Sequence, residues 1–322
     1  MGLLQDRRVL NLIEELSGKL RRKSIEEKTI PRFVFVCGEQ ILDDEGKLID
    51  KDILEEKNNI RYFIMKSFSK QKHKGEYDKE SYPVQCVISE YLYSEDSWVD
   101  ILTFEEVLAE ISEYIIIITE SPGTYCELGA FALNDSFANK TIVINEDNLE
   151  YKNSFITKGP IRKIETQHEE NIILYNGKAN LKSSLQLNDL IAKISTKQVK
   201  YTPNLDPEKL GLKNLIYELL NIIELFQPIS VYEIEVLYKK IKKISNYTIY
   251  NRDKHKIRSL KLVIELMKKM KLIKNINGFY HLNEGITCYK AMFAIDRKYL
   301  NKFRTQYLCR VYKCEPDRMR TC

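Results

Sequence analysis

Residues 114–145 constrain the fold more than any other part of the chain. They open with YIIIIT (114–119), a continuous apolar run rather than an alternating one, as is typical of a strand covered by helices on both faces. The turn ESPG follows, residues 124–138 have helical spacing, and KTIVIN (140–145) fits another strand. Strand, turn, helix and strand in about 30 residues form a βαβ unit with parallel strands. The pattern therefore predicts an α/β fold.

Flanking segments extend this unit into a doubly wound parallel sheet. RFVFVC (32–37), ending at Gly38, predicts a buried strand and a tight turn, and residues 59–68 predict a second strand. The other predicted elements are helices over 3–28, 84–95 and 102–113, with Leu102, Val107, Leu108 and Ile111 on the inner face of the last, and a final strand and helix over 172–195. We expect one α/β domain over residues 1–200.

The last third of the chain has a different pattern. Pro203 and Pro207 mark a linker, and Asn277-Gly278 lies between two short β-like runs, which is a strong hairpin signal. Three segments before this hairpin have helical spacing, 208–226, 230–244 and 256–271. Three helices followed by a hairpin is the order of a winged helix. We expect a winged-helix-like domain over 206–285 and a basic, aromatic tail over 286–322.

Charge is distributed unevenly between these parts. Residues 201–322 contain 24 Lys and Arg against 12 Asp and Glu, whereas the first 200 residues contain 27 against 34. Lysine and arginine concentrate on and before the predicted helix 256–271. This balance favours a phosphate-backbone partner, so nucleic acid is expected to bind through the basic C-terminal region. A solvated helix face is the alternative.

The composition also indicates a compartment. The apolar runs are far shorter than the roughly 20 residues that span a bilayer, and the first residues do not form a signal peptide. Seven scattered cysteines without a CxxC pair indicate reduced thiols. We expect a cytoplasmic protein without membrane contact. No metal site is expected, because the four histidines are isolated: His73, His168, His255 and His281.

Glu127, three residues after Thr124, has two interpretations. Thr124-x-x-Glu127 matches a capping box, in which the glutamate only closes the start of a helix. Alternatively the glutamate performs chemistry on a ligand at the carboxyl end of the strand, where open α/β sheets bind ligands. Gly129 favours the second interpretation, because glycine costs about 1 kcal/mol in a helix interior and suits a place where a backbone or ligand comes close.

GTYCELGAF (123–131) resembles the site motif of nucleoside 2-deoxyribosyltransferases, in which the glutamate is the nucleophile that attacks C1′ of the sugar. The resemblance implies that Glu127 is this nucleophile. It also implies that a family aspartate before the glycine corresponds to Glu120, shifted by one residue, and that a further one corresponds to Asp100 or Glu106. The implied substrate-binding residues are Cys37, Gly38, Glu39, Glu120, Ser121, Gly123 and Thr124.

The wider arrangement resembles the deoxyribosyltransferase-like effectors encoded with bacterial retrons. An α/β domain with this motif, followed by a basic winged-helix region, accounts for most of the chain. The resemblance implies a toxic anti-phage effector that is held in a higher-order complex by a reverse transcriptase and its RNA-linked single-stranded DNA. It also implies cleavage of the N-glycosidic bond of a nucleotide or NAD with water as acceptor, and no cofactor.

Two rival interpretations are a non-catalytic, nucleotide-sensing DNA-binding regulator and a structural scaffold within a reverse-transcriptase complex. The number of carboxylates, Asp100, Glu106, Glu120 and Glu127, favours an enzyme over a phosphate binder. Of the two upstream carboxylates we expect Glu106 to matter more than Asp100. The expected reason is that Glu106 flanks the apolar helix face, Glu105 lies nearer the solvent, and Asp100 caps the helix.

Overall fold

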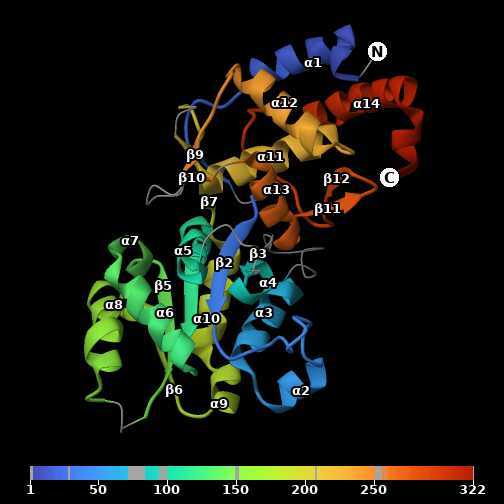
Figure 1. The fold of residues 1–322 in the computed structure, drawn as a ribbon. Coiled ribbons are helices and arrows are strands. Elements are labelled where there is room, and N and C mark those ends of the chain that lie inside the picture. The colour runs from blue at the N-terminus through green and yellow to red at the C-terminus, as the bar shows by residue number, and fades with distance from the viewer. Residues whose placement is uncertain are drawn as a thin grey trace. The chain divides into compact units, whose positions relative to one another are not determined.

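The computed structural model describes residues 3–27, 30–71, 84–93, 100–148, 152–206, 209–250, 256–257 and 259–321. The chain forms two compact units (Figure 1). Arg32–Lys197 make the α/β unit, and Met1–Pro31 together with Gln198–Cys322 make the helical unit. The α/β unit is therefore inserted into the helical unit, and the first 31 residues do not belong to it as the prediction of a 1–200 domain required.

The α/β unit is built on one parallel five-stranded sheet, as predicted. Its strands lie in the order β3-β2-β4-β5-β6, namely Val84–Val87, Arg32–Cys37, Tyr114–Ile118, Thr141–Glu146 and Ile172–Tyr175. The direction of this order reverses between β2 and β4. Ligands of open α/β sheets bind at such a reversal, outside the carboxyl ends of the strands. The segments after β2 and β4 therefore meet at the expected place for a ligand.

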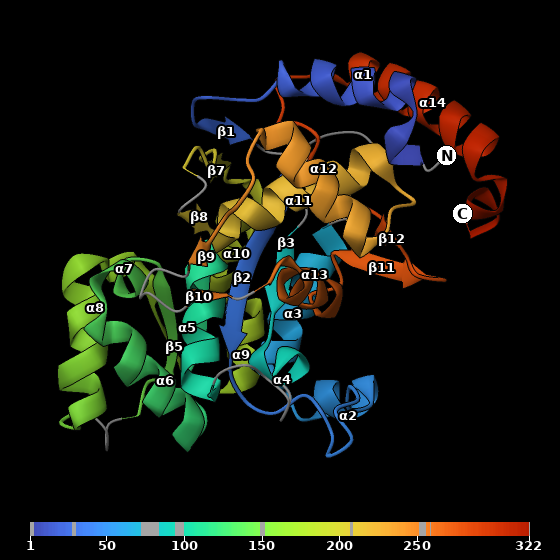
Figure 2. The ribbon, with the colours of Figure 1, turned by 45° about the horizontal axis from the view of Figure 1, so that its top comes forward.

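Helices cover both faces of this sheet (Figure 2). On one face Val36 and Ile116 pack in a buried cluster with α3 and α10. On the other face Phe35 contacts Phe131 of α6 edge to face, with ring centroids 6.0 Å apart. The helices of the unit are α2 Lys51–Glu56, α3 Ile60–Gln71, α4 Ser89–Leu92, α5 Ile101–Ile111, α6 Pro122–Leu133, α7 Asp135–Ala138, α8 Arg162–Gln167, α9 Lys178–Ser183 and α10 Leu185–Thr196, with the short turns η3 Thr157–Ile161 and η4 Glu169–Asn171.

Two predicted elements of this unit are wrong. Residues 59–68 form the start of α3 rather than a strand, and their buried side chains Ile60, Ile64 and Phe68 recur every four residues, which is a helical spacing. Residues 84–95 begin with the edge strand β3 and only then enter the short helix α4. A four-residue strand is too short to show an alternating pattern, so the sequence did not distinguish it from helix.

The helical unit surrounds the buried helix α11. Its helices are α1 Arg7–Ser17, α11 Leu212–Phe226, α12 Val231–Lys242, α13 Leu260–Lys269 and α14 Arg297–Cys314, with the turns η1 Leu3–Gln5 and η5 Pro316–Thr321. Among the described residues, its short strands form three small sheets. β1 Ile25–Glu27 pairs with β7 Val199–Tyr201, and β9 Ile249–Tyr250 lies between β8 Leu210–Gly211 and β10 Lys256–Ile257. The third is the hairpin of β11 Ile273–Ile276 and β12 Phe279–Leu282. The predicted N-terminal helix over 3–28 is shorter than expected, because it ends at Gly18 and leads into β1.

The predicted hairpin is confirmed. Asn277 and Gly278 both have positive φ, 52° and 86°, as a two-residue turn that matches strand twist requires. The aromatic tail is part of the core of this unit. Phe303 and Tyr307 of α14 pack against Phe226 of α11, with ring centroids 5.3 and 5.0 Å apart.

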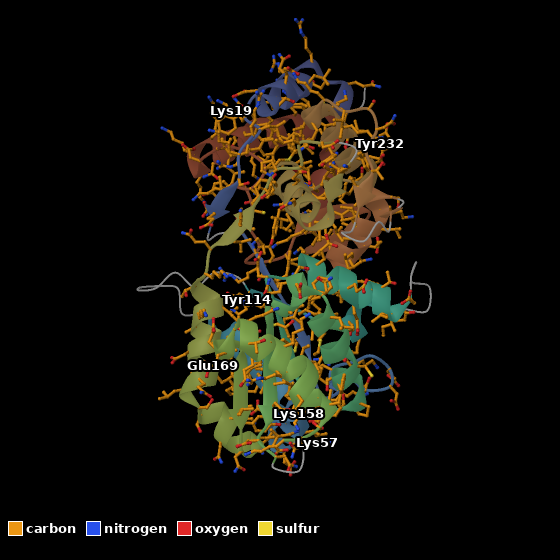
Figure 3. All side chains as sticks on the ribbon, turned by 90° about the vertical axis from the view of Figure 1, so that its left-hand side faces the viewer. Lys19, Lys57, Tyr114, Lys158, Glu169 and Tyr232 are labelled. Atoms are coloured by element: carbon orange, nitrogen blue, oxygen red, sulfur yellow. The ribbon has the colours of Figure 1, made fainter. Side chains whose placement is uncertain are left out.

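Charged side chains lie on the surface of both units, together with large apolar ones such as Leu133 and Phe155, which are 81% and 82% exposed. Lys57, Lys158 and Glu169 are exposed on the α/β unit, and Lys19 is exposed on the helical unit (Figure 3). Tyr232, an aromatic residue on α12, is 73% exposed. Among the described residues, none of the helices combines the length and the apolar character that crossing a bilayer demands.

Candidate active site

The helix that carries Glu127 is capped one turn earlier than the sequence indicated. The N-cap of α6 is Ser121, whose Oγ accepts from the backbone N–H of Thr124 at 3.4 Å. In return Thr124 Oγ1 accepts from the backbone N–H of Ser121 at 3.1 Å. The reciprocal cap is thus Ser121-x-x-Thr124, and the interpretation of Thr124-x-x-Glu127 as a capping box is wrong. The Glu127 carboxylate therefore does not cap the helix and instead contacts side chains inside the α/β unit.

Glu127 lies beside the thiol of Cys37 at the end of β2 and the carboxyl group of Glu105 on α5, so the protonation of these three groups is linked. Its Oε2 atom is buried without a hydrogen-bond partner among the described residues. Burial raises the pKa of Glu127, while the neighbouring thiol of Cys37 and the positive charge of Arg61 act in the opposite direction. Burial also raises the pKa of Glu105 to about 7, with a further contribution from the negative charge of Glu127. Near neutral pH, Glu105 is therefore protonated for a substantial fraction of the time.

Cys37 stays protonated beside this pair. Burial, followed by the negative charge of Glu127, raises the pKa of the Cys37 thiol well above its ordinary value. Because only 2% of Cys37 is exposed, it acts through Glu127 rather than as a wall of an open site. The thiol is consequently a donor that orients the carboxylate.

The orientation expected for helix α5 is wrong in one respect. Its buried stripe is Phe104, Val107, Leu108 and Ile111, whereas Leu102 is 53% exposed. This stripe turns Glu105 inward, where it is 8% exposed, and leaves Glu106 half-buried about 100° further round the helix. The structure therefore brings Glu105, rather than Glu106, beside Glu127. A catalytic role for Glu106 stays a prediction.

Asp100 is the N-cap of α5. Its carboxylate accepts from the backbone N–H of Thr103 at 3.0 Å and from the Thr103 hydroxyl at 2.8 Å. These two hydrogen bonds lower the pKa of Asp100. The side chain is exposed, which is the ordinary situation of a capping aspartate.

The buried Arg61 places a positive charge near the carboxyl pair. Arg61, on α3, forms a two-pronged ion pair with Glu90 at 2.5 and 2.7 Å, and its Nε donates to the backbone oxygen of Val36 at 3.0 Å. Gly38 lies directly over it, and a Cβ at this glycine would come within 2.8 Å of Ile118 Cδ1 and 3.2 Å of Arg61 Cβ. A larger residue in the turn after β2 would therefore have to displace the Ile118 side chain and press on Arg61. Arg61 fixes this turn and places a positive charge near Glu127.

Lys178, which the sequence analysis missed, joins two predicted site residues at the strand ends. It begins α9, just after β6, and its Nζ lies 2.9 Å from Glu39 Oε2 and 2.8 Å from Glu120 Oε1. The backbone N–H of Glu39 also donates to Glu120 Oε2 at 3.4 Å. Although burial acts in the opposite direction, the hydrogen bonds to Glu120 and Glu39 raise the pKa of Lys178. Lys178 could have been found from the sequence by its position directly after Gly177 and the predicted last strand, because that strand ends at the same edge of the sheet.

The charged groups around this edge of the sheet are mainly acidic. The carboxyl groups are those of Glu39, Glu90, Glu105, Glu120 and Glu127, against the cations Arg61 and Lys178. A Cβ at Gly129 would meet no described protein atom within 4 Å, so the expectation of a closely approaching protein backbone is wrong. Gly123 is exposed at the start of the same helix.

The described residues at this site do not form a set of metal ligands. In the part of the chain that the structure describes, no group of three or more His, Cys, Asp or Glu side chains is arranged to hold a metal ion. His168 and His281 lie on α/β and helical units respectively, while His73 and His255 lie outside the described residues. The ionisable side chains gathered at this site are mainly carboxyl groups.

The basic helix of the helical unit is α13. Lys261, Lys268 and Lys269 are exposed on it, and part of the basic segment before it lies outside the described residues. Ile229, between α11 and α12, forms an antiparallel bridge with Tyr280 of the hairpin, with backbone hydrogen bonds of 2.7 and 3.3 Å. The connection between α11 and α12 is thus paired with the hairpin through this single bridge.

Comparison with known proteins finds a matching family and two relatives. Residues 57–275 match the family of the STM3845 retron effector protein. Over 312 residues, or 90% of this chain and 88% of the relative, the chain is 23% identical to the "Retron Ec73 putative ribosyltransferase/DNA-binding protein" of Escherichia coli. It is 25% identical over 220 residues to the corresponding Ec86 protein of the same organism, covering 65% of this chain and 68% of that protein. Since the matched residues make up more than half of the sequence, this chain belongs to the STM3845 retron effector family.

Proposed function

We propose that this protein is a toxic effector of a retron anti-phage system and that it hydrolyses the N-glycosidic bond of a nucleotide or NAD. The observation that carries the proposal is the pair formed by half-buried Glu127 and buried Glu105 at the reversal of strand order. Breaking a bond between C1′ and a base nitrogen builds positive charge on the sugar, and an ionised carboxylate beside C1′ stabilises that charge or attacks it. The relatives' names, which include ribosyltransferase, support the same class of reaction.

In the proposed mechanism Glu127 is the nucleophile. Its carboxylate forms an ester bond to C1′ as the C1′–N bond breaks, and the bonding electrons leave with the base. For a neutral nucleoside, Glu105 transfers its proton to the departing base nitrogen. Water then attacks C1′ of the ester while ionised Glu105 accepts a proton, which releases the sugar and restores both carboxyl groups.

The raised pKa of Glu105 suits this double role. A carboxylic acid with a pKa of about 7 is protonated for a substantial fraction of the time at neutral pH and also accepts a proton readily. Nicotinamide needs no such proton, because it leaves a positively charged ring as a neutral molecule. The proposed substrate-binding residues Cys37, Gly38, Glu39, Glu120, Ser121, Gly123 and Thr124 surround the strand ends, with Lys178 added to them.

The helical unit is proposed to attach the effector to nucleic acid and to its partners. A winged-helix arrangement is supported by the helix order, the confirmed hairpin and the bridge between Ile229 and Tyr280. We propose that this unit joins a cytoplasmic higher-order complex with a retron reverse transcriptase and its RNA-linked single-stranded DNA. The relatives' names also include DNA-binding.

The test is to incubate the purified protein, with and without its retron complex, with NAD and with deoxynucleosides. Chromatography should reveal free nicotinamide or free base, and Glu127→Gln should release none. A wild-type protein that binds these compounds and leaves them intact under both conditions would favour a non-catalytic nucleotide sensor.

A further inference from the structure

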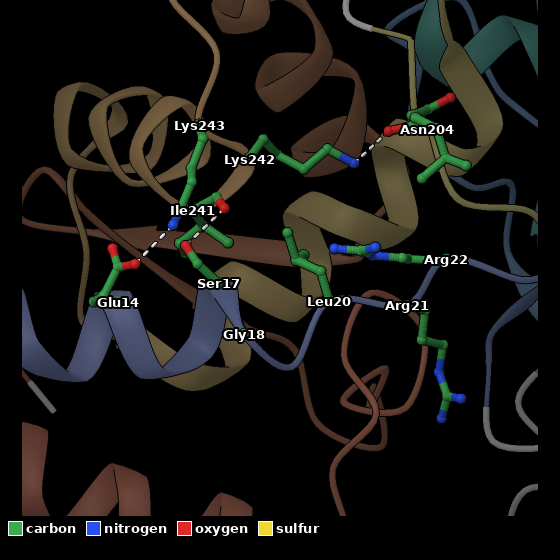
Figure 4. A pocket seen from close by; sticks show the side chains of 11 residues that line it. Glu14, Ser17, Gly18, Leu20, Arg21, Arg22, Asn204, Ile241, Lys242 and Lys243 are labelled. Atoms are coloured by element: carbon green, nitrogen blue, oxygen red, sulfur yellow. Dashed lines mark hydrogen bonds and ion pairs between the residues drawn. The ribbon is translucent and has the colours of Figure 1, made fainter.

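The helical unit contains a basic pocket that the proposed chemistry does not use. It has a volume of about 380 Å³ and lies where the ends of α1 and α12 meet residues 20–22 and 204–205 (Figure 4). Four basic side chains line it, Arg21, Arg22, Lys242 and Lys243, against one acidic side chain, Glu14. Its volume is within the range of small-ligand sites, so it has room for about one nucleotide.

The two lysines are partly neutralised by their own neighbours. Lys243 pairs with Glu14 at 2.6 Å, and both side chains are largely exposed, so this pair is weak and can rearrange. Lys242 is held more firmly. Its Nζ lies 2.9 Å from the fully buried Glu218 and also donates to the backbone oxygen of Asn204. An ammonium group has three donors, so one donor of Lys242 remains beside these two bonds, and the 10% exposed side chain sets a fixed positive charge in the pocket wall.

The two arginines supply the remaining positive charge. The Nε of Arg21 donates to the backbone oxygen of Lys290 at 2.8 Å, and in Figure 4 this side chain points away from the pocket. The Arg22 side chain extends across the pocket toward Leu20. Within the described ranges of the chain, Arg22 forms no hydrogen bond or ion pair with another residue. Its five N–H donors are thus available to a ligand.

We propose that this pocket binds a backbone phosphate of single-stranded nucleic acid, with Arg22 as the principal contact and Lys242 as a fixed second one. A guanidinium group pairs with phosphate through two parallel hydrogen bonds, which a point charge does not achieve. Leu20 and Leu205 provide apolar surface for the attached sugar. The proposal rests on the proposed nucleic-acid role of the helical unit and adds a specific site to it.

An acidic protein segment is the competing occupant. A nucleic-acid strand is favoured because the excess of basic residues continues through the whole C-terminal part, with 24 Lys and Arg against 12 Asp and Glu in residues 201–322. Such an extended positive field suits a long, evenly charged polyanion. The pocket would then fix one phosphate of a strand that the rest of the surface attracts without positional preference.

The experiment uses the full-length protein and a fluorescent 20-nucleotide oligothymidine, with binding measured by anisotropy at several KCl concentrations. Arg22→Gln is compared with Lys298→Gln, which removes the same charge from an exposed position of α14 in the same unit. We expect Arg22→Gln to weaken binding about tenfold and to reduce the slope of log affinity against log salt by about 0.7, the value for one phosphate contact on a single strand. Lys298→Gln should change affinity less than twofold.

A third variant separates geometry from charge. Arg22→Lys should keep most of the salt slope and still bind several times more weakly, because it loses the two-pronged contact. Equal oligothymidine binding by Arg22→Gln and Lys298→Gln would overturn the pocket proposal. If polyglutamate binding alone weakened in Arg22→Gln, an acidic protein segment would be the occupant instead. Failure of the wild-type protein itself to bind oligothymidine at low salt would overturn the nucleic-acid role as well, which distinguishes the two failures.

Discussion

The carboxyl groups of Glu105 and Glu127 lie side by side inside the α/β unit, and burial raises the pKa of both. Two carboxyl groups that approach so closely do not both ionise readily, so they divide one proton between them. Removing two carboxyl groups from water costs free energy, and apolar side chains of similar size would stabilise the fold more. Its position at the ends of β2 and β4 links it to ligand chemistry rather than to stability.

Glu127→Gln is expected to abolish glycosidic cleavage and cellular toxicity, with thermal stability unchanged or slightly raised. The helix cap is made by Ser121 and Thr124, so the substitution leaves it intact, and it removes a buried charge. Release of free base, toxicity on expression and the thermal midpoint are the measurements. Cleavage at a rate near that of the wild type would show that Glu127 is not the nucleophile.

Glu105→Gln is expected to reduce cleavage of neutral nucleosides by 10²–10⁴-fold, the usual contribution of a positioned general acid. The matched control is Glu106→Gln, the neighbouring glutamate that is turned about 100° away. Asp100→Asn should have little effect, because asparagine caps helices as well as aspartate does. A large loss in Glu106→Gln with Glu105→Gln active would restore the assignment made from the sequence.

Cleavage should depend on pH according to the leaving group. Glu105 must be protonated to assist a neutral base, so single-turnover cleavage of deoxynucleosides is expected to fall as pH rises through about 7. Cleavage of NAD in the same assay should lack this decline, because nicotinamide departs without a proton. Identical pH profiles for both substrates would exclude Glu105 as the acid.

The same group should make the fold less stable as pH rises. A carboxyl group whose pKa is raised by folding binds its proton more tightly in the folded state, so its stabilising contribution is present below about pH 4 and is lost as pH rises through about 7. Glu105→Gln should therefore stabilise the protein at pH 8 relative to wild type, by on the order of 2 kcal/mol, and do less at pH 5. Thermal unfolding at both pH values checks this prediction.

Arg61→Met is expected to destabilise the α/β unit by about 1–3 kcal/mol, because it removes the donor to the buried Val36 backbone oxygen and leaves the partly exposed Glu90 without its partner. Its second effect is electrostatic. Loss of the positive charge should raise the pKa of Glu127 and shift the acidic limb of the pH–rate profile upward. Adding Glu90→Gln should recover part of the stability. If that double variant regained the wild-type profile too, Arg61 would have only a structural role.

The α/β unit is expected to fold alone as residues 32–197 and to lose attachment to the complex of reverse transcriptase and RNA-linked DNA at physiological salt. A truncation that keeps residues 1–205 is the informative comparison. It retains α1, whose buried residues Val9, Ile13 and Leu16 would lose the helices that cover them. We expect the longer fragment to be less soluble than the shorter one, as measured by light scattering. Co-purification of the shorter fragment with the complex would contradict the proposed role of the helical unit.

The sequence by itself determined the elements whose signal is local. The isoleucine run predicted β4, because a strand buried on both faces needs a continuous apolar run. Asn277-Gly278 predicted the hairpin, because both residues tolerate the positive φ of its turn. The motif around Glu127 also directed attention to the sheet edge where β2 and β4 end. Each of these inferences depends only on residues close together in the chain.

Only the tertiary structure decided which side chains meet. The inward turn of Glu105 depends on the helix face that α5 buries against the sheet, and a helix with apolar residues on several sides does not reveal that face in its sequence. Lys178 reaches Glu39 and Glu120 because β6 ends at the same edge as β2 and β4, about 140 and 60 residues away along the chain. Likewise α1 belongs to the helical unit because its apolar stripe is covered by α12 and α14. Burial patterns are encoded locally, whereas the partner that covers each buried surface is set by strand order and packing.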